Sequence, residues 1–215
     1  MNSFRIILDL LFPESCLVCG KSDETLCAAC AHALPRGFSP DQNTLVILDY
    51  GDRRVKRALW LFKYRNKRAL AKIFAGLMAD ILPEELAEWR LTKNFTEPLL
   101  VPIPISARRF RERGYNQAEL MARELVLQTG EFALTLATDI LVKIKDTPSQ
   151  VKTTSKRERL KNLRGSFSVK NPETIRGRNI ILLDDIVTTG ATLAEARGVL
   201  KKAGAKKILA VVVAH

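Results

Sequence analysis

Two adjacent carboxylates, Asp184 and Asp185, follow an apolar stretch that favours a buried strand. A turn rich in hydroxyl groups comes next, and then a helical pattern. Backbone amides and the positive end of a helix dipole bind phosphate in such turns, and a glycine lets the backbone approach the ligand. Carboxylates at the end of a strand can accept hydrogen bonds from the vicinal hydroxyls of a sugar. The pattern predicts a sugar-phosphate site; an ordinary acidic turn is the alternative. The turn contains Thr188, Thr189, Gly190, Ala191 and Thr192.

Other phosphate and hydrolase chemistries fit the sequence less well. The segment 180–193 has neither the lysine of a P-loop nor the three glycines of a dinucleotide fingerprint. The chain has two histidines, His32 and His215, at the edges of its two parts. A Ser-His-Asp hydrolase is therefore disfavoured.

The four cysteines lie in two pairs, Cys16-x2-Cys19 and Cys27-x2-Cys30, separated by seven residues. Two such pairs can place four thiolates around one ion, and zinc favours a closed tetrahedral site of this kind. A closed site leaves no position open for catalysis, so we expect a structural zinc that stabilises a small segment. His32 is a spare donor that the four cysteines make unnecessary. Two disulfides are the alternative, which the lack of a secretion signal disfavours.

Basic residues gather in two blocks. Residues 53–68 hold eight of them and no acid, with aromatic side chains interleaved. Residues 1–50 carry a net charge of −3 and residues 51–215 a net charge of +15. Basic side chains beside aromatic rings are typical of single-stranded nucleic acid binding, although Trp60 and Phe62 are expected in the core. A solvated surface, or a pyrophosphate site for some arginines, is the alternative. The arginines predicted to contact nucleic acid are Arg53, Arg54, Arg57, Arg108, Arg109, Arg111 and Arg113.

Apolar runs alternate with helical patterns after residue 45, which predicts an α/β fold with a mostly parallel sheet covered on both faces. Strands are expected at 45–50, 99–105, 140–144, 179–183 and 207–214, and helices around Ile73, at 117–128 and at 191–203. We expect a zinc ribbon at 1–40 that begins with a docking helix, a linker at 35–43, and a larger domain at 45–215. No apolar run could span a membrane and no secretion signal is apparent, so a cytoplasmic protein is expected.

The segment 183–192, Leu-Asp-Asp-Ile-Val-Thr-Thr-Gly-Ala-Thr, resembles the phosphoribosyl pyrophosphate signature of type I phosphoribosyltransferases. With the cysteine ribbon and the segment Arg111-x-Arg113-Gly114-Tyr115-Asn116-Gln117-Ala118, the chain resembles the ComF family of competence proteins. Phe-Lys-Tyr-Arg at 62–65 is a further match, and so is Thr147-x2-Gln150 followed by Arg157, Arg159, Leu160 and Asn162. The resemblance therefore covers nearly the whole chain.

This resemblance implies roles for particular residues. Asp184 and Asp185 would be the catalytic carboxylates that hold the ribose hydroxyls, directly or through magnesium. Residues 188–192 would cradle the 5′-phosphate, and Lys63, Tyr64 and Arg65 would lie near the pyrophosphate. Residues 145–156 occupy the place of the flexible loop that closes over the substrate and excludes water.

The resemblance also implies a function in DNA uptake and natural competence, on incoming single-stranded DNA, with a site for phosphoribosyl pyrophosphate and magnesium. No catalytic base stands out in the sequence, so the enzymatic activity stays open. A metabolic phosphoribosyltransferase that joins a base or an amine to phosphoribose is one alternative. A non-catalytic adaptor, whose ribbon docks a helicase or a recombination partner, is the other.

Overall fold

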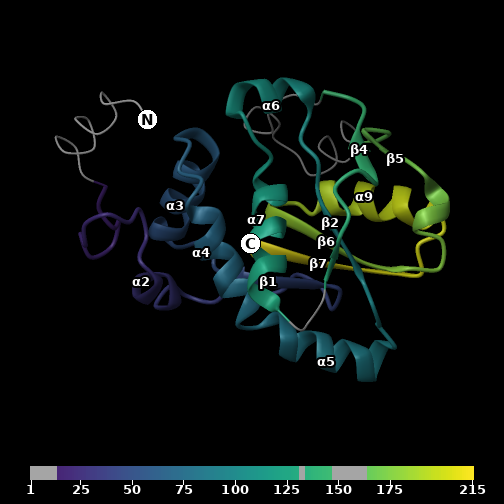
Figure 1. Ribbon diagram of the computed structural model, residues 1–215, viewed down its shortest axis with the longest axis horizontal. Helices are drawn as coiled ribbons and strands as arrows, with labels where there is room; N and C mark the ends of the chain where they lie inside the picture. Colours follow the sequence, from purple (N-terminus) through teal and green to yellow (C-terminus); the bar gives the residue numbers. More distant parts are fainter. Residues whose placement is uncertain (1–13, 131–133, 147–163) are drawn as a thin grey trace.

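A parallel sheet of five strands forms the centre of the computed structural model, which describes residues 14–130, 134–146 and 164–215 (Figure 1). The strand order is β1-β7-β6-β2-β3, and every pairing in this sheet is parallel. The central strands β6 and β7 are almost entirely buried, as expected of a sheet covered on both faces. The strands are β1 Thr44–Leu48, β2 Leu99–Pro102, β3 Thr135–Leu136, β6 Asn179–Ile186 and β7 Lys207–Ala214.

Different elements cover the two faces of this sheet (Figure 1). α4 Leu70–Ala79 and α7 Gln117–Thr129 pack together on one face. α9 Ala191–Lys202 lies on the other face, beside a small antiparallel sheet of β4 Leu141–Lys143 and β5 Phe167–Val169. The remaining elements are α2 Ala28–His32, α3 Arg53–Tyr64, α5 Leu82–Lys93, α6 Ala107–Arg113 and the 3-10 helix η2 Pro172–Thr174.

The alternation of side chains along β6 decides where the two carboxylates point. Ile181 and Leu183 are buried with α4 and α7, whereas Ile180 and Leu182 are buried on the α9 face. Successive side chains of a strand point to opposite faces. Asp185 therefore continues the set that faces α7, and Asp184 continues the set that faces α9 and β4.

The cysteine ribbon packs on the larger body through α2 and α4. Two of its cysteines share one buried cluster with side chains of α4; the ribbon members are Cys16, Leu26, Cys27, Ala31 and Leu34, and those of α4 include Phe74 and Met78. Nε2 of His32 lies 2.8 Å from Oδ2 of Asp80, which follows α4. The ribbon and the sheet-containing body therefore share a hydrophobic core.

The predicted linker lies along β1. The amide of Asp49 donates to the carbonyl oxygen of Pro35 at 2.9 Å, and the amide of Gly37 donates to that of Ile47 at 3.3 Å. A Cβ atom on Gly37 would lie 2.4 Å from the carbonyl oxygen of Leu48, so this close approach requires glycine. The chain between ribbon and sheet is thus part of the packed structure.

All five expected strands are present, with two corrections to the expected arrangement. The strand expected at 140–144 pairs with β5 outside the main sheet. Trp60, expected in the core, is 38 % exposed. The buried stripe of α3 is formed by Val55, Ala58, Leu59 and Phe62, and Trp60 lies off that stripe. Phe62 is buried as predicted.

Two of the predicted features, a helix and a loop, fall on residues that the structure does not describe. The docking helix expected before residue 14 and the expected loop from residue 147 onward lie outside the described residues. Within the described part, none of the helices has the length and apolar character needed to cross a membrane.

Candidate functional site

The end of β6 places a carboxylate next to a lysine of α3. Nζ of Lys63 lies 2.8 Å from Oδ1 of Asp185, and only 17 % and 11 % of the two side chains are exposed. The amide of Asp185 donates a 2.8 Å hydrogen bond to Oδ1 of Asp184. Removing both ions of such a pair from water has a desolvation cost that their attraction must offset. The ion pair holds the side chains of Lys63 and Asp185 in fixed positions at the end of β6.

Asp184 has a different environment on the other face of the sheet. Burial raises its pKa to about 7, the charge of Asp185 adds to the rise, and Lys63 and Lys143 oppose it. Lys143 ends β4, and burial together with the charge of Arg109 lowers its pKa to about 8. A divalent cation would neutralise a carboxylate that is held in this way, and magnesium prefers carboxylate oxygens. The donor set of Asp184 and Asp185 thus fits magnesium.

α3 positions Lys63 because the helix is fixed at both ends and buried along one stripe. The carboxylate of Asp52 accepts hydrogen bonds from the amides of the first turn, which caps the helix. At the other end, the hydroxyl of Tyr115 donates a hydrogen bond to the carbonyl oxygen of Phe62. The rings of Tyr115 and Phe62 lie 5.9 Å apart. Tyr115 therefore holds the turn of α3 that carries Lys63.

A cavity of about 390 Å³ opens beside the two carboxylates. α6 supplies three arginines to its wall, and the helix begins at Ser106, whose hydroxyl accepts from the amide of Arg109 at 3.4 Å. Five basic and three acidic side chains line the space, a balance that favours phosphate groups. These charged residues are Lys63, Arg108, Arg109, Glu112, Arg113, Lys143, Asp184 and Asp185.

The turn after β6 leads into α9 next to this cavity. Gly190 precedes the helix with φ of 74°, a left-handed conformation that favours glycine. Residues 186–193 line a small hollow at this turn, and Thr192 also lines the larger cavity. A helix N-terminus offers a phosphate both free amides and the positive end of the dipole. The predicted phosphate turn and the carboxylate pair therefore adjoin the same space.

The structure brings the predicted phosphoribosyl pyrophosphate residues together with one exception. Those that line the cavity are Lys63, Tyr64, Asp184, Asp185 and Thr192, and Thr188, Thr189, Gly190 and Ala191 line the adjoining hollow. Arg65 is not among the described residues that line either space. Its guanidinium lies 5.2 Å from the ring of Trp60 instead.

The arginines predicted to contact nucleic acid divide into two groups. Arg108, Arg109 and Arg113 line the cavity, while Arg111 is exposed elsewhere on α6. Arg53, Arg54 and Arg57 lie in the first two turns of α3. Arg54 is paired with Asp52 at 2.7 Å, and Arg57 lies 4.8 Å from the ring of Trp60. Arg54 and Lys63, which lies at the cavity, are thus nine positions apart on one helix.

Lys143 and Gln117 are among the cavity residues that were given no role from the sequence. Lys143 lies near the end of the strand expected at 140–144, just before the expected loop, which is the only sequence signal for it. Gln117 lies in the segment that resembles the ComF family and is 1 % exposed. Its Oε1 accepts from Arg113 at 3.0 Å, whereas its Nε2 has no hydrogen-bond partner in the described part of the chain. That amide group is a buried donor on the cavity wall.

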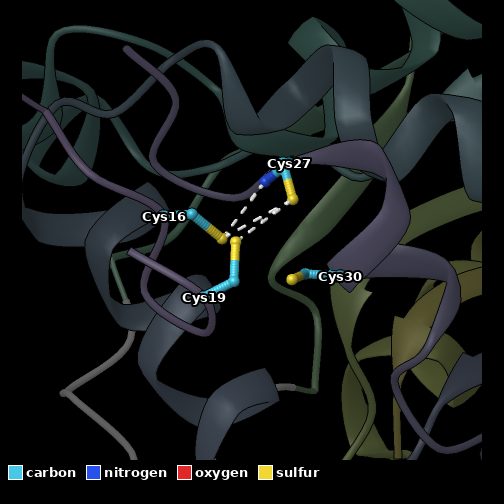
Figure 2. Close-up of side chains that lie close together, drawn as sticks. All are labelled: Cys16, Cys19, Cys27 and Cys30. Carbon is cyan, nitrogen blue, oxygen red and sulfur yellow. Dashed lines mark hydrogen bonds between the residues drawn. The ribbon is translucent and has the colours of Figure 1, made fainter. Parts of the chain in front are cut away.

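The four cysteine sulfurs converge on one point (Figure 2). Sγ of Cys16 and Sγ of Cys19 each lie 3.8 Å from Sγ of Cys27, and all four sulfurs lie within 4.8 Å of one another. A tetrahedral zinc with bonds of about 2.3 Å separates its sulfurs by about 3.8 Å. A disulfide would need about 2.05 Å, and the described cysteines, Cys30 included, are free thiols. The spacing fits a structural zinc.

The backbone around the sulfurs favours a thiolate. Burial raises the pKa of Cys16, but hydrogen bonds from the amides of Cys19, Cys27 and Val18 lower it overall, to about 6. The pKa of Cys30 is raised to about 12, chiefly because its thiol hydrogen-bonds to Cys27 and Cys19. Four crowded thiols cannot all ionise alone, so a divalent cation is what lets them do so.

Two family models match the chain, one for each part. A double zinc ribbon domain matches residues 7–40, and a phosphoribosyl transferase domain matches residues 81–215. Together with the parallel sheet, the cysteine cluster and the carboxylate site, they define a protein of the phosphoribosyltransferase fold class with an amino-terminal zinc ribbon.

Relatives whose names refer to DNA use or competence align with most of the chain. The DNA utilization protein YhgH of Escherichia coli O157:H7 is 28 % identical over 207 residues, which is 90 % of this chain and 86 % of the relative. Competence protein F of Haemophilus influenzae is 26 % identical, over 90 % of this chain and 81 % of its own. Competence protein ComFC of Streptococcus pneumoniae is 30 % identical, over 91 % of this chain and 78 % of its own. The chain belongs to the ComF family. A hypoxanthine phosphoribosyltransferase structure from Staphylococcus aureus aligns with a TM-score of 0.36 at 19 % identity, over 63 % of this chain and 61 % of its own.

Proposed function

We propose that this protein binds phosphoribosyl pyrophosphate with magnesium, binds single-stranded DNA, and acts in the cytoplasm in DNA uptake or natural competence. The names of the relatives, which refer to competence and DNA utilization, support the role in DNA use. The observation that carries the ligand proposal is the carboxylate pair at the end of β6, with Lys63 at 2.8 Å and a phosphate turn beside one cavity.

Each part of the ligand has a matching part of the site in this proposal. Asp184 and Asp185 take the ribose hydroxyls and the magnesium ion. The turn at 188–192 takes the 5′-phosphate at the start of α9. Lys63 and the three arginines of α6 that line the cavity take the pyrophosphate, and Gln117 donates its free amide hydrogen. Bound magnesium would supply charge neutralisation for the pyrophosphate oxygens.

The ligand proposal is tested by calorimetry with phosphoribosyl pyrophosphate and magnesium. Replacing both Asp184 and Asp185 with Asn should weaken binding by about one to two decades, because a charge-assisted hydrogen bond contributes about 1.5–3 kcal/mol. Asp139→Asn is the matched control, since this exposed carboxylate lines a separate cavity near the start of β2. Unchanged affinity in a folded double variant would remove the carboxylates from the site.

The DNA proposal is tested by the salt dependence of binding. Fluorescence anisotropy with a labelled oligonucleotide should show a log–log slope of about −0.7 for each phosphate that the protein neutralises. Replacing Arg108, Arg109 and Arg111 with Ala should flatten the slope by about two units. The matched control removes three exposed lysines at the far end of α9, namely Lys201, Lys202 and Lys206, and should keep the slope. An unchanged slope in the arginine variant would contradict the proposal.

The two alternatives predict other outcomes of the same measurements. A metabolic phosphoribosyltransferase would turn over with an acceptor base or amine, depend strongly on Asp184, and bind DNA weakly. An adaptor for a helicase or recombination partner would bind that partner through the ribbon and show no heat with phosphoribosyl pyrophosphate. Binding of both ligands by one chain is the outcome that supports the proposed function.

A further inference from the structure

α3 presents two aromatic rings to solvent on the side away from its buried stripe. Trp60 is 38 % exposed and Tyr64 is 58 % exposed, whereas Phe62 between them is fully buried. The centroids of the two exposed rings lie 6.3 Å apart. Large exposed aromatic rings on a strongly basic helix are a feature that core packing does not explain.

Arginines from two helices lie over these rings. The guanidinium groups of Arg57 and Arg65 lie 4.8 Å and 5.2 Å from the ring of Trp60. The guanidinium group of Arg113, on α6, lies 5.2 Å from the ring of Tyr64. Arginines and rings therefore alternate from the middle of α3 across to α6, and we call these five residues the stacking track.

The geometry of the stacking track suits a single strand better than a duplex. Aromatic rings stack on bases and neighbouring arginines neutralise phosphates in proteins that bind single strands. The ring separation of 6.3 Å is nearly twice the rise of about 3.4 Å between stacked bases in a duplex. Two successive bases can reach both rings only when they are pulled apart, and base pairing in a duplex opposes this.

The track ends at the sugar-phosphate cavity. Tyr64 and Arg113 both line that cavity, and Tyr64 directly follows Lys63 in the chain. Acidic residues at the start of α3, on α6 and in the cavity are paired with basic ones: Asp52 with Arg54, Glu112 with Arg108 at 3.9 Å, and Asp185 with Lys63. A nucleic acid strand that follows the track therefore arrives over the mouth of the cavity.

We propose that single-stranded DNA lies along the stacking track, with bases on Trp60 and Tyr64 and phosphates on Arg57, Arg65 and Arg113. We propose further that the strand continues from Arg113 onto the other arginines of α6, and that it excludes phosphoribosyl pyrophosphate from the adjoining cavity. This inference rests on the proposed function, since it requires both ligands. It adds that the two bind in competition, because Tyr64 and Arg113 cannot serve both at once.

The position of the DNA is tested with the fluorescence of Trp60. The other tryptophan, Trp89, is 5 % exposed and packs on Phe95, so Trp89→Phe leaves Trp60 as the single reporter. Titration with an unlabelled oligo-dT strand should quench this fluorescence. Trp60→Ala should weaken oligonucleotide binding about 5- to 100-fold, the value of one stacked base. Phe38→Ala, which removes an 89 % exposed ring outside the track, should leave the affinity unchanged. Binding by anisotropy without quenching would place the DNA elsewhere and overturn the inference.

Competition is tested by measuring oligo-dT affinity at rising concentrations of phosphoribosyl pyrophosphate and magnesium, with ionic strength held constant by sodium chloride. The apparent dissociation constant should rise linearly with the ligand concentration, from its value without ligand. The Asp184→Asn, Asp185→Asn double variant should bind oligo-dT but lose this rise, and Trp60→Ala should keep its calorimetric affinity for phosphoribosyl pyrophosphate. If calorimetry shows that both ligands bind and the dissociation constant stays flat, the competition is refuted while the proposed function stands. If either ligand fails to bind alone, the proposed function fails and the inference with it.

Discussion

Asp184 and Asp185 are adjacent in sequence but have different electrostatic surroundings. Asp185 has the ammonium group of Lys63 at 2.8 Å. Asp184 has its pKa raised from 3.8 to about 7, chiefly by burial and then by the charge of Asp185. The folded chain therefore binds a proton at Asp184 more tightly than the unfolded chain does. This contribution to stability is present below the unfolded pKa and is lost as the pH rises through the folded pKa.

We expect Asp184→Asn to stabilise the protein in a pH-dependent way. Asn stands in for the protonated acid. The free energy of unfolding of the variant should therefore equal that of the natural chain near pH 4 and exceed it above pH 7, where the natural chain must bury a charge. Urea unfolding at several pH values measures the difference in the free energy of unfolding. Asp139→Asn, on an exposed carboxylate, serves as the control and should show no such trend. A constant difference across the pH range would mean that Asp184 is not held protonated.

The residues of the site could be predicted from the sequence only where one short continuous segment of the chain positions them. The carboxylates and the turn at 188–192 follow one strand and precede one helix, so a short segment specifies them. Lys143 reaches Asp184 through the pairing of β4 with β5, whose partners are far apart in sequence. Arg65 lies two residues beyond Lys63, and two positions on a helix differ by about 200°. Resemblance alone could not show that only one of them faces the cavity.

The start of α9 depends on the conformation of Gly190. Its φ of 74° is one that other residues adopt at a cost, so we expect Gly190→Ala to lower the free energy of unfolding by about 1–2 kcal/mol. The substitution should also weaken phosphoribosyl pyrophosphate binding, because the amides of the turn would be displaced. Urea unfolding and calorimetry measure the two effects.

A second glycine of the same helix provides the control. Gly198 is exposed in the middle of α9, and a Cβ there would have no neighbour within 4 Å. Gly198→Ala should therefore stabilise the protein by about 0.5–1 kcal/mol and leave ligand binding unchanged. If Gly190→Ala behaved like Gly198→Ala, the turn would not be the phosphate site.

Among the elements, the clarity of the apolar pattern decided which ones the sequence could predict. α7, α9, β6 and β7 are long enough for their periodicity to be clear. β3 has two residues, β5 has three and α6 has seven, which is too few for a period to emerge. α3 is longer, but its buried stripe is interleaved with so many basic residues that charge was the more obvious pattern. The same ambiguity explains why Trp60, which is exposed, was wrongly expected in the core.

At the scale of the whole molecule, the zinc ribbon and α4 are stabilised together. The cluster that contains Cys16 and Cys27 also contains apolar side chains of α4. We expect removal of zinc by a chelator to lower the melting temperature of the whole chain in one transition, because loss of the ribbon uncovers α4. Calorimetric scanning with and without chelator measures this. Two separate transitions, with the larger one unchanged, would show that the ribbon folds independently.

The ligand set of the zinc is tested by elemental analysis. The protein should carry one zinc per chain, and Cys19→Ser should lose it, since the sulfur of Cys19 belongs to the group of four. His32→Gln should keep the metal, because the ring of His32 bonds to Asp80 and the carbonyl oxygen of Ala28 instead. Zinc lost from the histidine variant and retained by the cysteine variant would contradict the four-cysteine site.

The strip of chain from Pro35 to Gly37 also has a consequence for aggregation. β1 is an edge strand, paired on one side with β7, and the strip bonds to the outer side of its last residues. Uncovered edges offer unpaired amides and carbonyls to other chains. A fragment that starts at residue 45, the domain boundary expected from sequence, would expose that edge and associate with itself, whereas a fragment that starts at residue 35 would keep the edge protected. Size-exclusion chromatography of the two fragments, neither of which contains the four cysteines, would separate the effect of the strip from that of the zinc.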